Sequence, residues 1–325
     1  MFYRRLGKSN IEVSALGLGC YAIGGPFRVE NGKPWGWSQV DDRESIRAIH
    51  AGLDLGINFI DTAQAYGCGH SEAVIGKAIK GRRDKVILAT KFGKVIDEKD
   101  KRILGSTIDA DDLRQALEGS LRRFDSDYID LYQWHESRGK TEDVPELLDL
   151  LDSFVQAGKI RWYGWSTDDP ERARLFAQSP NCAAIQHRLH VFENPENAAA
   201  VLAVCQEFDT ASINRSPLMM GILTGKFKTD TTFPEDDVRH SLGFDFEKGL
   251  LAEYRDKAEN IRAVLTSEGR SMVQGALAWI WARHERTIPI PGFKSVKQVQ
   301  ENARAMEFRP LNPTQMRQID EILER

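Results

Sequence analysis

Eight short apolar segments recur along this chain, and each is followed by a longer amphipathic stretch. This alternation constrains the fold most strongly, because β-prone runs that alternate with helical patterns are typical of a parallel sheet built from βα units. The expected strands span residues 14–20, 57–61, 86–91, 128–134, 160–165, 182–186, 210–214 and 287–291. The expected helices span residues 42–55, 71–80, 110–124, 145–157, 170–178, 195–208, 250–267 with 271–284, and 295–306.

Eight strands that are each followed by a helix predict an α/β fold, and specifically a (β/α)8 TIM barrel. No Pro/Ser-rich linker separates the units, so we expect a single domain over residues 1–325 rather than two doubly wound halves. Residues 2–13 alternate in character around a Gly-Lys-Ser-Asn turn and predict a β-hairpin over the N-terminal face of the barrel. The connections 22–41 and 215–248 are long, and loops of this length at the C-terminal face are expected to be either functional or disordered.

Composition excludes several classes of function. Of the 325 residues, 41% are hydrophobic and 28% are charged, which is a globular balance. The net charge of −4 provides no cationic surface for nucleic acid or for a membrane, so we expect neither partner. The chain has no apolar run of the ~20 residues that span a bilayer and no apolar secretory signal, so we expect a cytoplasmic protein. Four widely spaced cysteines without a zinc pattern predict free thiols and no metal site.

Polar side chains mark the ends of three expected strands. Asp61 and Lys91 close the second and third strands, His135 follows the fourth, and Tyr66 lies in the loop after Asp61. These residues should meet, because the C-terminal ends of barrel strands form one rim. An ammonium group beside a phenol favours the phenolate and lowers the phenol pKa, whereas an imidazole can donate a hydrogen bond to a carbonyl oxygen. Such a set can polarise and protonate a carbonyl group.

Several blocks of sequence resemble the aldo-keto reductase superfamily, in the order that this superfamily has them. The blocks are GLGCYAIGG, INFIDTAQAYGCGHSE, ATKFG, DLYQWH, GKIRWYGWS, SPLMMGILTGKF and IPIPGFKSVKQVQEN. The long first loop, with its Trp-Gly-Trp sequence, is similar to the bacterial-type branch. The resemblance implies a (β/α)8 barrel, an NADP(H) cofactor and a catalytic tetrad in which Tyr66 is the general acid. The tetrad would be Asp61, Tyr66, Lys91 and His135.

The resemblance also implies which residues bind the cofactor. The backbone around Cys20 and Tyr21 would approach the nicotinamide ring, and Ser166 and Gln186 would hydrogen-bond its carboxamide. Asp61 belongs to this cofactor set as well as to the tetrad. The loop along the pyrophosphate would contribute Ser216, Pro217, Leu218, Gly221 and Lys226. The adenosine phosphate site would contribute Gly292, Lys294, Gln298, Glu301 and Asn302.

The chain departs from many relatives at several positions near this site. Arg215 stands where an aromatic residue usually stacks on the nicotinamide; its guanidinium could stack there instead, and its charge would favour the reduced cofactor. Glu136 and Ser137 replace a Trp-Pro pair after the histidine, and Leu189 replaces a tyrosine, which changes the pocket rim. Cys68 is expected to be exposed. The candidates for an apolar wall of the substrate pocket are Tyr21, Phe27, Trp35, Trp37, Phe92 and Trp134, although five of the six would be ordinary core or loop aromatics in any other barrel.

Two patterns are interpreted as having no function. Residues 17–22 fit the letters of a GxGxxA dinucleotide fingerprint, but the Gly-Gly-Pro sequence that follows prevents the helix that this fingerprint needs. His187 and His190 are interpreted as loop histidines rather than metal ligands, because the sequence places no third ligand nearby.

The expected function is therefore that of an NADP(H)-dependent oxidoreductase that reduces an aldehyde or ketone, or that acts in reverse on a polyol or sugar. One alternative is a nucleotide-binding regulatory subunit that senses redox state with little turnover, as the potassium-channel β subunits of this superfamily are thought to do. Those relatives replace the tetrad histidine, which this chain keeps as His135. A metal hydrolase would need more His and carboxylate ligands at strand ends. The sequence leaves the substrate, the reaction direction and the oligomeric state open.

Overall fold

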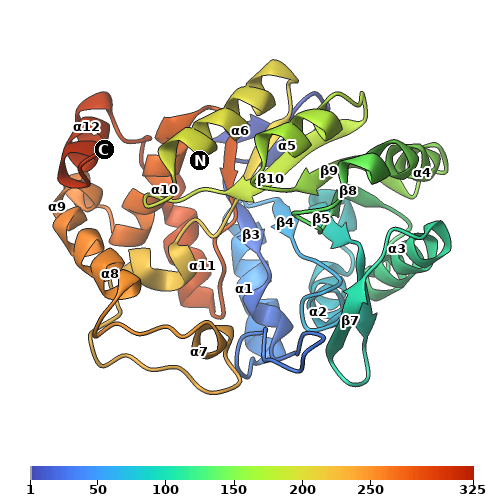
Figure 1. Ribbon diagram of the computed structural model, residues 1–325, viewed down its shortest axis with the longest axis horizontal. Coiled ribbons are helices and arrows are strands. Elements are labelled where there is room, and N and C mark those ends of the chain that lie inside the picture. Colours follow the sequence, from blue (N-terminus) through green and yellow to red (C-terminus); the bar gives the residue numbers. More distant parts are fainter. Residues whose placement is uncertain (1) are drawn as a thin grey trace.

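The computed structural model describes residues 2–325, in which eight parallel strands form a barrel surrounded by helices (Figure 1). The strands are hydrogen-bonded in sequence order, and a parallel bridge between Gly19 and Gly292 closes the circle. The predicted (β/α)8 barrel is thus confirmed, with all eight strands at the predicted places. They are β3 (Gly17–Gly19), β4 (Phe59–Asp61), β5 (Ile87–Phe92), β8 (Ile129–Trp134), β9 (Ile160–Ser166), β10 (Cys182–Arg188), β11 (Ala211–Arg215) and β12 (Thr287–Pro289).

The outer helices follow the predicted pattern. They are α1 (Asp42–Asp54), α2 (His70–Ile79), α3 (Ala110–Phe124), α4 (Val144–Gln156), α5 (Pro170–Ala177), α6 (Pro195–Glu207), α8 (Leu250–Asn260), α9 (Arg262–Leu265), α10 (Met272–Arg283) and α11 (Val296–Arg304). The helix predicted over residues 250–267 is divided at Ile261 into α8 and α9, because the ψ of −2° at this residue departs from the helical value. Within residues 2–325, no helix has the length and the apolar character that a membrane crossing requires.

Some elements were not predicted. A two-stranded antiparallel hairpin, β6 (Lys94–Asp97) and β7 (Arg102–Ser106), lies between β5 and α3. The short helix α7 (Val238–Ser241) lies in the second long loop, and α12 (Pro313–Ile322) follows the barrel. Short 3-10 turns complete the chain: η1 (Ala22–Gly24), η2 (Arg83–Lys85), η3 (Thr141–Asp143), η4 (Met219–Thr224), η5 (Ser267–Gly269) and η6 (Ala305–Glu307).

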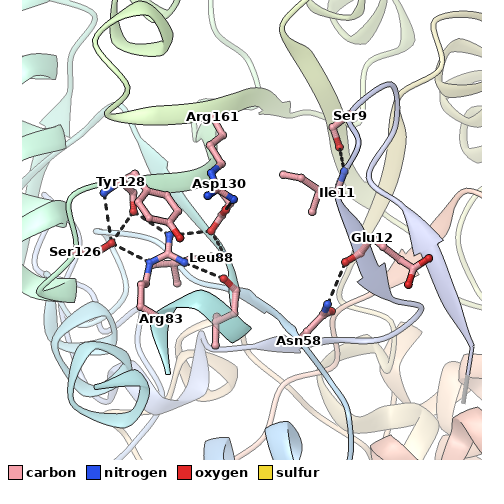
Figure 2. A network of polar contacts seen from close by, with 11 residues as sticks. Ser9, Ile11, Glu12, Asn58, Arg83, Leu88, Ser126, Tyr128, Asp130 and Arg161 are labelled. Carbon is pink, nitrogen blue, oxygen red and sulfur yellow. Dashed lines mark hydrogen bonds and ion pairs between the residues drawn. The ribbon is translucent and has the colours of Figure 1, made fainter. Parts of the chain in front are cut away.

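The predicted N-terminal hairpin closes one end of the barrel. It consists of β1 (Tyr3–Arg5) and β2 (Glu12–Ser14), which pair antiparallel. Two of its apolar side chains, Leu6 and Val13, are fully buried in the cluster that fills the barrel interior. Gly7 has a φ of +54°, and a Cβ there would lie 2.1 Å from a backbone oxygen of β10. Asn58 attaches the hairpin to the barrel, because its Nδ2 donates to the Glu12 carbonyl at 3.0 Å (Figure 2).

A buried carboxylate joins the starts of three strands at the same end (Figure 2). Asp130 accepts hydrogen bonds from Arg83 Nη2 at 2.8 Å, from Arg161 Nη1 at 2.8 Å and from the Leu88 amide at 2.9 Å. The centroid of the Tyr128 ring lies 3.9 Å from the guanidinium carbon of Arg83 and 4.3 Å from the guanidinium carbon of Arg161. These charge-assisted bonds connect β5, β8 and β9 far from the C-terminal rim, so we assign them to stability.

Candidate active site

A cavity of about 900 Å³ opens at the C-terminal ends of the strands. The two long loops that were expected to be functional or disordered form part of its wall. Of the predicted tetrad, Asp61, Tyr66 and His135 line this cavity directly. Every residue predicted to bind a cofactor lines it too: Cys20, Tyr21, Asp61, Ser166, Gln186, Arg215, Ser216, Pro217, Leu218, Gly221, Lys226, Gly292, Lys294, Gln298, Glu301 and Asn302.

Lys91 is fully buried below this cavity, and its ammonium group contacts three oxygen atoms. Nζ lies 2.6 Å from Asp61 Oδ1, 2.7 Å from the Thr62 carbonyl and 3.2 Å from Tyr66 Oη. The rings of Tyr66 and His135 meet nearly at right angles, with their centroids 5.7 Å apart. The structure therefore brings together all four residues that the sequence placed at one rim.

The alternation of side chains along the strands explains why these residues meet. Asp61 on β4, Lys91 on β5, Gln133 on β8 and Gln186 on β10 form a buried polar layer above the apolar interior of the barrel. Asp61 Oδ2 accepts hydrogen bonds from Gln133 Nε2 at 3.0 Å and from Gln186 Nε2 at 2.8 Å. Gln133 was missed by the sequence analysis, although counting back two positions from His135 would have found it.

Burial raises the pKa of the Tyr66 phenol above its ordinary value, and it outweighs the opposite effect of the Lys91 ammonium. The predicted lowering of this pKa is thus wrong as a net result, although Lys91 acts in the predicted direction. The cause is desolvation, which penalises the phenolate. Burial also lowers the pKa of Lys91, but Asp61 and Tyr66 raise it by more. At neutral pH, the site therefore holds a protonated phenol beside a charged ammonium.

His135 is a neutral imidazole in this setting. Burial lowers its pKa well below the ordinary value, and the positive charges of Lys91, Lys94 and Arg215 act in the same direction. Its buried Nδ1 has no hydrogen-bond partner among residues 2–325. A neutral imidazole carries one N–H donor, so His135 can offer a hydrogen bond to a carbonyl oxygen without adding charge.

A second region of the cavity surrounds the start of α11. Lys294 Nζ donates to the carbonyls of Ser38 and Gln39 at 3.1 and 3.0 Å, so this lysine joins the end of the barrel to the first long loop. Gln298 Oε1 accepts from the Lys294 amide at 2.7 Å. The Ser295 side chain caps the helix. A lysine beside a helix N-terminus provides positive potential for an anion.

Arg239 adds a cation to this second region and was not predicted. It forms a bidentate ion pair with the buried Asp237: Nε donates to Oδ1 and Nη2 donates to Oδ2, each at 2.8 Å. Its guanidinium carbon lies 4.1 Å from the Trp37 ring and 4.0 Å from the Phe233 ring. Burial lowers the pKa of Lys226, and the Arg239 charge lowers it further. No sequence signal marks Arg239, because its contact with Trp37 joins the second long loop to the first, and Phe233 lies in its own irregular loop.

Arg215 is the last residue of β11, and its guanidinium forms an ion pair with Asp168. Asp168 Oδ1 also accepts from the Arg188 amide at 2.7 Å. Burial raises the pKa of Asp168, but Arg215 and the Arg188 amide lower it by more, so the carboxylate stays ionised. The charge of Arg215 also acts on the tetrad, since it lowers the pKa of both Tyr66 and His135.

The aromatic wall of the cavity is only partly as predicted. Tyr21, Phe27, Trp35 and Trp37 line it. Phe92 and Trp134 do not, because each is adjacent in its strand to an inward-facing residue and so points toward the outer helices. Phe92 stacks on Tyr132 at a centroid distance of 4.6 Å, and Trp134 packs on Trp165 at 4.4 Å.

Two further expectations are wrong. Cys68 is fully buried rather than exposed, and burial raises the pKa of its thiol to about 11. His187 is not a loop residue but the sixth residue of β10, where its Nε2 lies 2.8 Å from Ser212 Oγ. His190 lies beyond the end of that strand and is buried as well. Within residues 2–325, no group of three or more His, Cys, Asp or Glu side chains is arranged to hold a metal ion.

Comparisons with known proteins agree with this geometry. The family model described as Aldo/keto reductase family matches residues 19–324. The chain belongs to the aldo/keto reductase family. It is 33% identical over 327 residues to aldo-keto reductase YhdN of Bacillus subtilis, a match that covers 100% of this chain and 94% of the relative. This bacterial relative agrees with the predicted branch of the family.

Solved structures of the family superpose over almost the whole chain. A glycerol dehydrogenase from Gluconobacter oxydans has a TM-score of 0.85 and 32% identity, with 99% of this chain and 95% of that chain covered. An aldo-keto reductase from Klebsiella pneumoniae, solved in complex with NADPH, has a TM-score of 0.71 and 25% identity, with 99% and 95% covered. These solved structures therefore share the fold of this chain, which is the barrel that the sequence predicted.

Proposed function

We propose that this aldo/keto reductase uses NADPH to reduce an aldehyde or ketone to an alcohol, and that residues 1–325 act as one domain. The observation that carries the proposal is the contact of 3.2 Å between Tyr66 Oη and Lys91 Nζ at the wall of the cavity. A buried phenol that is held beside an ammonium group can give up a proton and remain as a stabilised phenolate. The NADPH complex of the Klebsiella relative supports the choice of cofactor.

The residues that line the cavity fit a nicotinamide dinucleotide. Gln186 donates through Nε2 to Asp61 and Gln133, which leaves its Oε1 as an acceptor for a carboxamide N–H. Ser166 is its Cα partner on the adjacent strand and adds a hydroxyl donor. Around Gly292 the backbone is open, because a Cβ there would meet only the Gly19 oxygen, at 3.8 Å. In the second region, Lys226 and Lys294 would neutralise phosphate groups.

When bound, NADPH supplies the hydride that reduces the carbonyl carbon. Tyr66 gives its phenolic proton to the carbonyl oxygen, and the Lys91 ammonium stabilises the phenolate that remains. Asp61 holds Lys91 in place. The neutral His135 donates a hydrogen bond that orients the carbonyl group. In the reverse reaction, the Tyr66 phenolate removes the alcohol proton. General acid catalysis of this kind contributes about 10²–10⁴-fold to a rate.

Oxidation of a polyol is the second candidate function. It is favoured by the similarity to the Gluconobacter glycerol dehydrogenase, whose structure matches with a TM-score of 0.85. The site chemistry serves both directions, because Tyr66 can donate or accept the same proton. A regulatory subunit with little turnover is less favoured, since His135 and the rest of the tetrad are present and assembled.

The experiment is a turnover screen. NADPH oxidation is followed with aromatic aldehydes, short aliphatic aldehydes, sugars and quinones, beside NADP⁺ reduction with polyols. We expect turnover with at least one class, and its loss in Tyr66→Phe, which keeps the ring and removes only the hydroxyl. Tight NADPH binding without turnover in the whole screen would contradict the proposal and favour the regulatory subunit.

A further inference from the structure

An ion pair lies in the cavity wall beside the tetrad. Lys94 Nζ, on hairpin strand β6, lies 2.7 Å from Glu136 Oε2, and both side chains line the cavity. Ser106 on β7 joins the pair, because its Oγ is 2.9 Å from Lys94 Nζ and 3.0 Å from Glu136 Oε2. The two charged side chains are 23% and 31% exposed. They interrupt a wall to which Phe27, Val29 and Ile103 contribute apolar surface.

The structure fixes this pair next to the reacting groups. Glu136 directly follows His135, and its carbonyl accepts from Trp165 Nε1 at 2.8 Å. The Lys94 carbonyl accepts from Gln64 Nε2 at 2.6 Å, in the loop that leads to Tyr66. Both backbones are therefore held by hydrogen bonds. The Lys94 charge is close enough to lower the pKa of His135.

We propose that Lys94 and Glu136 select carbonyl substrates that carry a hydroxyl group near the carbonyl carbon. This inference rests on the proposed function and names the class of its substrate. A hydroxyl both accepts and donates, so it can accept from the Lys94 ammonium and donate to the Glu136 carboxylate. An apolar substrate would displace water from both charged groups without replacing the hydrogen bonds that the water makes, and this desolvation costs binding free energy. The apolar wall then contacts the carbon atoms of the substrate.

The same pair disfavours a substrate carboxylate. Burial raises the pKa of Glu136, but its hydrogen bonds with Lys94 and Ser106 lower it by more, so Glu136 is ionised at neutral pH. Its negative charge already neutralises Lys94. A substrate carboxylate that approached Lys94 would therefore meet a like charge, which opposes binding.

The test compares two aldehydes that differ only in their hydroxyl groups. Glyceraldehyde has two of them, and 2-methylbutanal carries a methyl group in place of each. The variants are Glu136→Gln, Lys94→Met and the double variant. The control is Lys99→Met, which removes the same positive charge as Lys94→Met but from the exposed turn of the hairpin. Hydration and intrinsic reactivity of the aldehydes cancel, because each variant is compared with the wild type. NADPH affinity and thermal unfolding are measured to show that each variant is folded.

We expect the glyceraldehyde to 2-methylbutanal ratio of kcat/KM to fall by about 10- to 100-fold in either single variant, since each loses a hydrogen bond to a charged group. The double variant should lose little more, because the pair acts as a unit. Glu136→Gln should also gain activity on glyoxylate, whose carboxylate can then pair with Lys94. Lys99→Met should keep the wild-type ratio.

Unchanged ratios in both single variants would overturn the inference, as would a wild type that prefers glyoxylate to glyceraldehyde. A different result would reveal failure of the proposed function itself: the wild type binds NADPH but turns over neither aldehyde nor any member of the wider screen. The two failures are thereby distinguished, because only the second abolishes turnover.

Discussion

Replacing Lys91 by Met removes an ammonium group and keeps most of its apolar stem. Tyr66 then loses a positive charge at 3.2 Å, so its pKa, which burial already raises, rises further. An opposite charge at this range changes the ratio of phenolate to phenol by about 10- to 1000-fold. Alcohol oxidation needs the phenolate, so we expect its rate at neutral pH to fall by about that factor. The rise of this rate with pH should move to more alkaline pH.

The same variant should also lose stability, because Asp61 is buried. Its Oδ2 keeps the hydrogen bonds from Gln133 and Gln186, but its Oδ1 loses the Lys91 partner at 2.6 Å. An unpaired buried carboxylate costs about 3–5 kcal/mol, and for a chain of this length that lowers Tm by about 4–7 °C. The double variant Lys91→Met/Asp61→Asn should recover stability without recovering activity, which separates the two effects.

The assay is the rate of NADP⁺-dependent alcohol oxidation from neutral to alkaline pH, beside calorimetry. A Lys91→Met protein with the wild-type pH profile would show that Lys91 does not act on Tyr66. A Tm equal to that of the wild type would show that the Asp61 carboxylate finds another partner.

Three further predictions address other parts of the molecule. Asp130→Asn should lower the free energy of unfolding by about 3 kcal/mol in chemical denaturation, because it weakens the bonds to Arg83 and Arg161, and kcat should not change; an unchanged denaturation midpoint would contradict this role. Lys294→Glu should weaken NADPH binding by about 10- to 500-fold while NADH binding barely changes, and equal losses for both cofactors would show that the phosphate site is misplaced. Arg215→Gln should strengthen NADP⁺ binding relative to NADPH by about 2- to 10-fold, because it removes a cation from the cavity; the ratio of the two Kd values tests this, and no change would mean that Asp168 cancels the charge.

The barrel was predictable because its strands are short, apolar and bounded by turn residues. The hairpin of β6 and β7 was not, because its apolar residues stand in adjacent pairs, Val95 with Ile96 and Ile103 with Leu104, so neither strand shows the polar/apolar alternation that indicates a half-buried strand. The hairpin also pairs with the first long loop, through a bridge between Arg28 and Arg102. Contacts between two loops leave no periodicity in either sequence, so they are invisible to pattern analysis.

The tetrad residues were predictable because each lies at or just after a strand end. The net pKa of Tyr66 was not, because it depends on how completely its surroundings exclude water. The Tyr21 ring packs on Tyr66 at a centroid distance of 4.8 Å, and the Tyr21 hydroxyl donates to the Trp35 carbonyl in the first long loop. This burial comes from the three-dimensional arrangement of the loop, whereas the charge of Lys91 could be inferred from the sequence alone.

A single-turnover experiment shows whether Tyr66 is the proton donor. Wild type and Tyr66→Phe are loaded with NADPH, mixed with the best aldehyde from the screen and followed by NADPH absorbance. We expect the variant to bind NADPH with nearly the wild-type Kd, and its rate of hydride transfer to fall by about 10²–10⁴-fold. Hydride transfer at the wild-type rate in Tyr66→Phe would show that Tyr66 is not the proton donor.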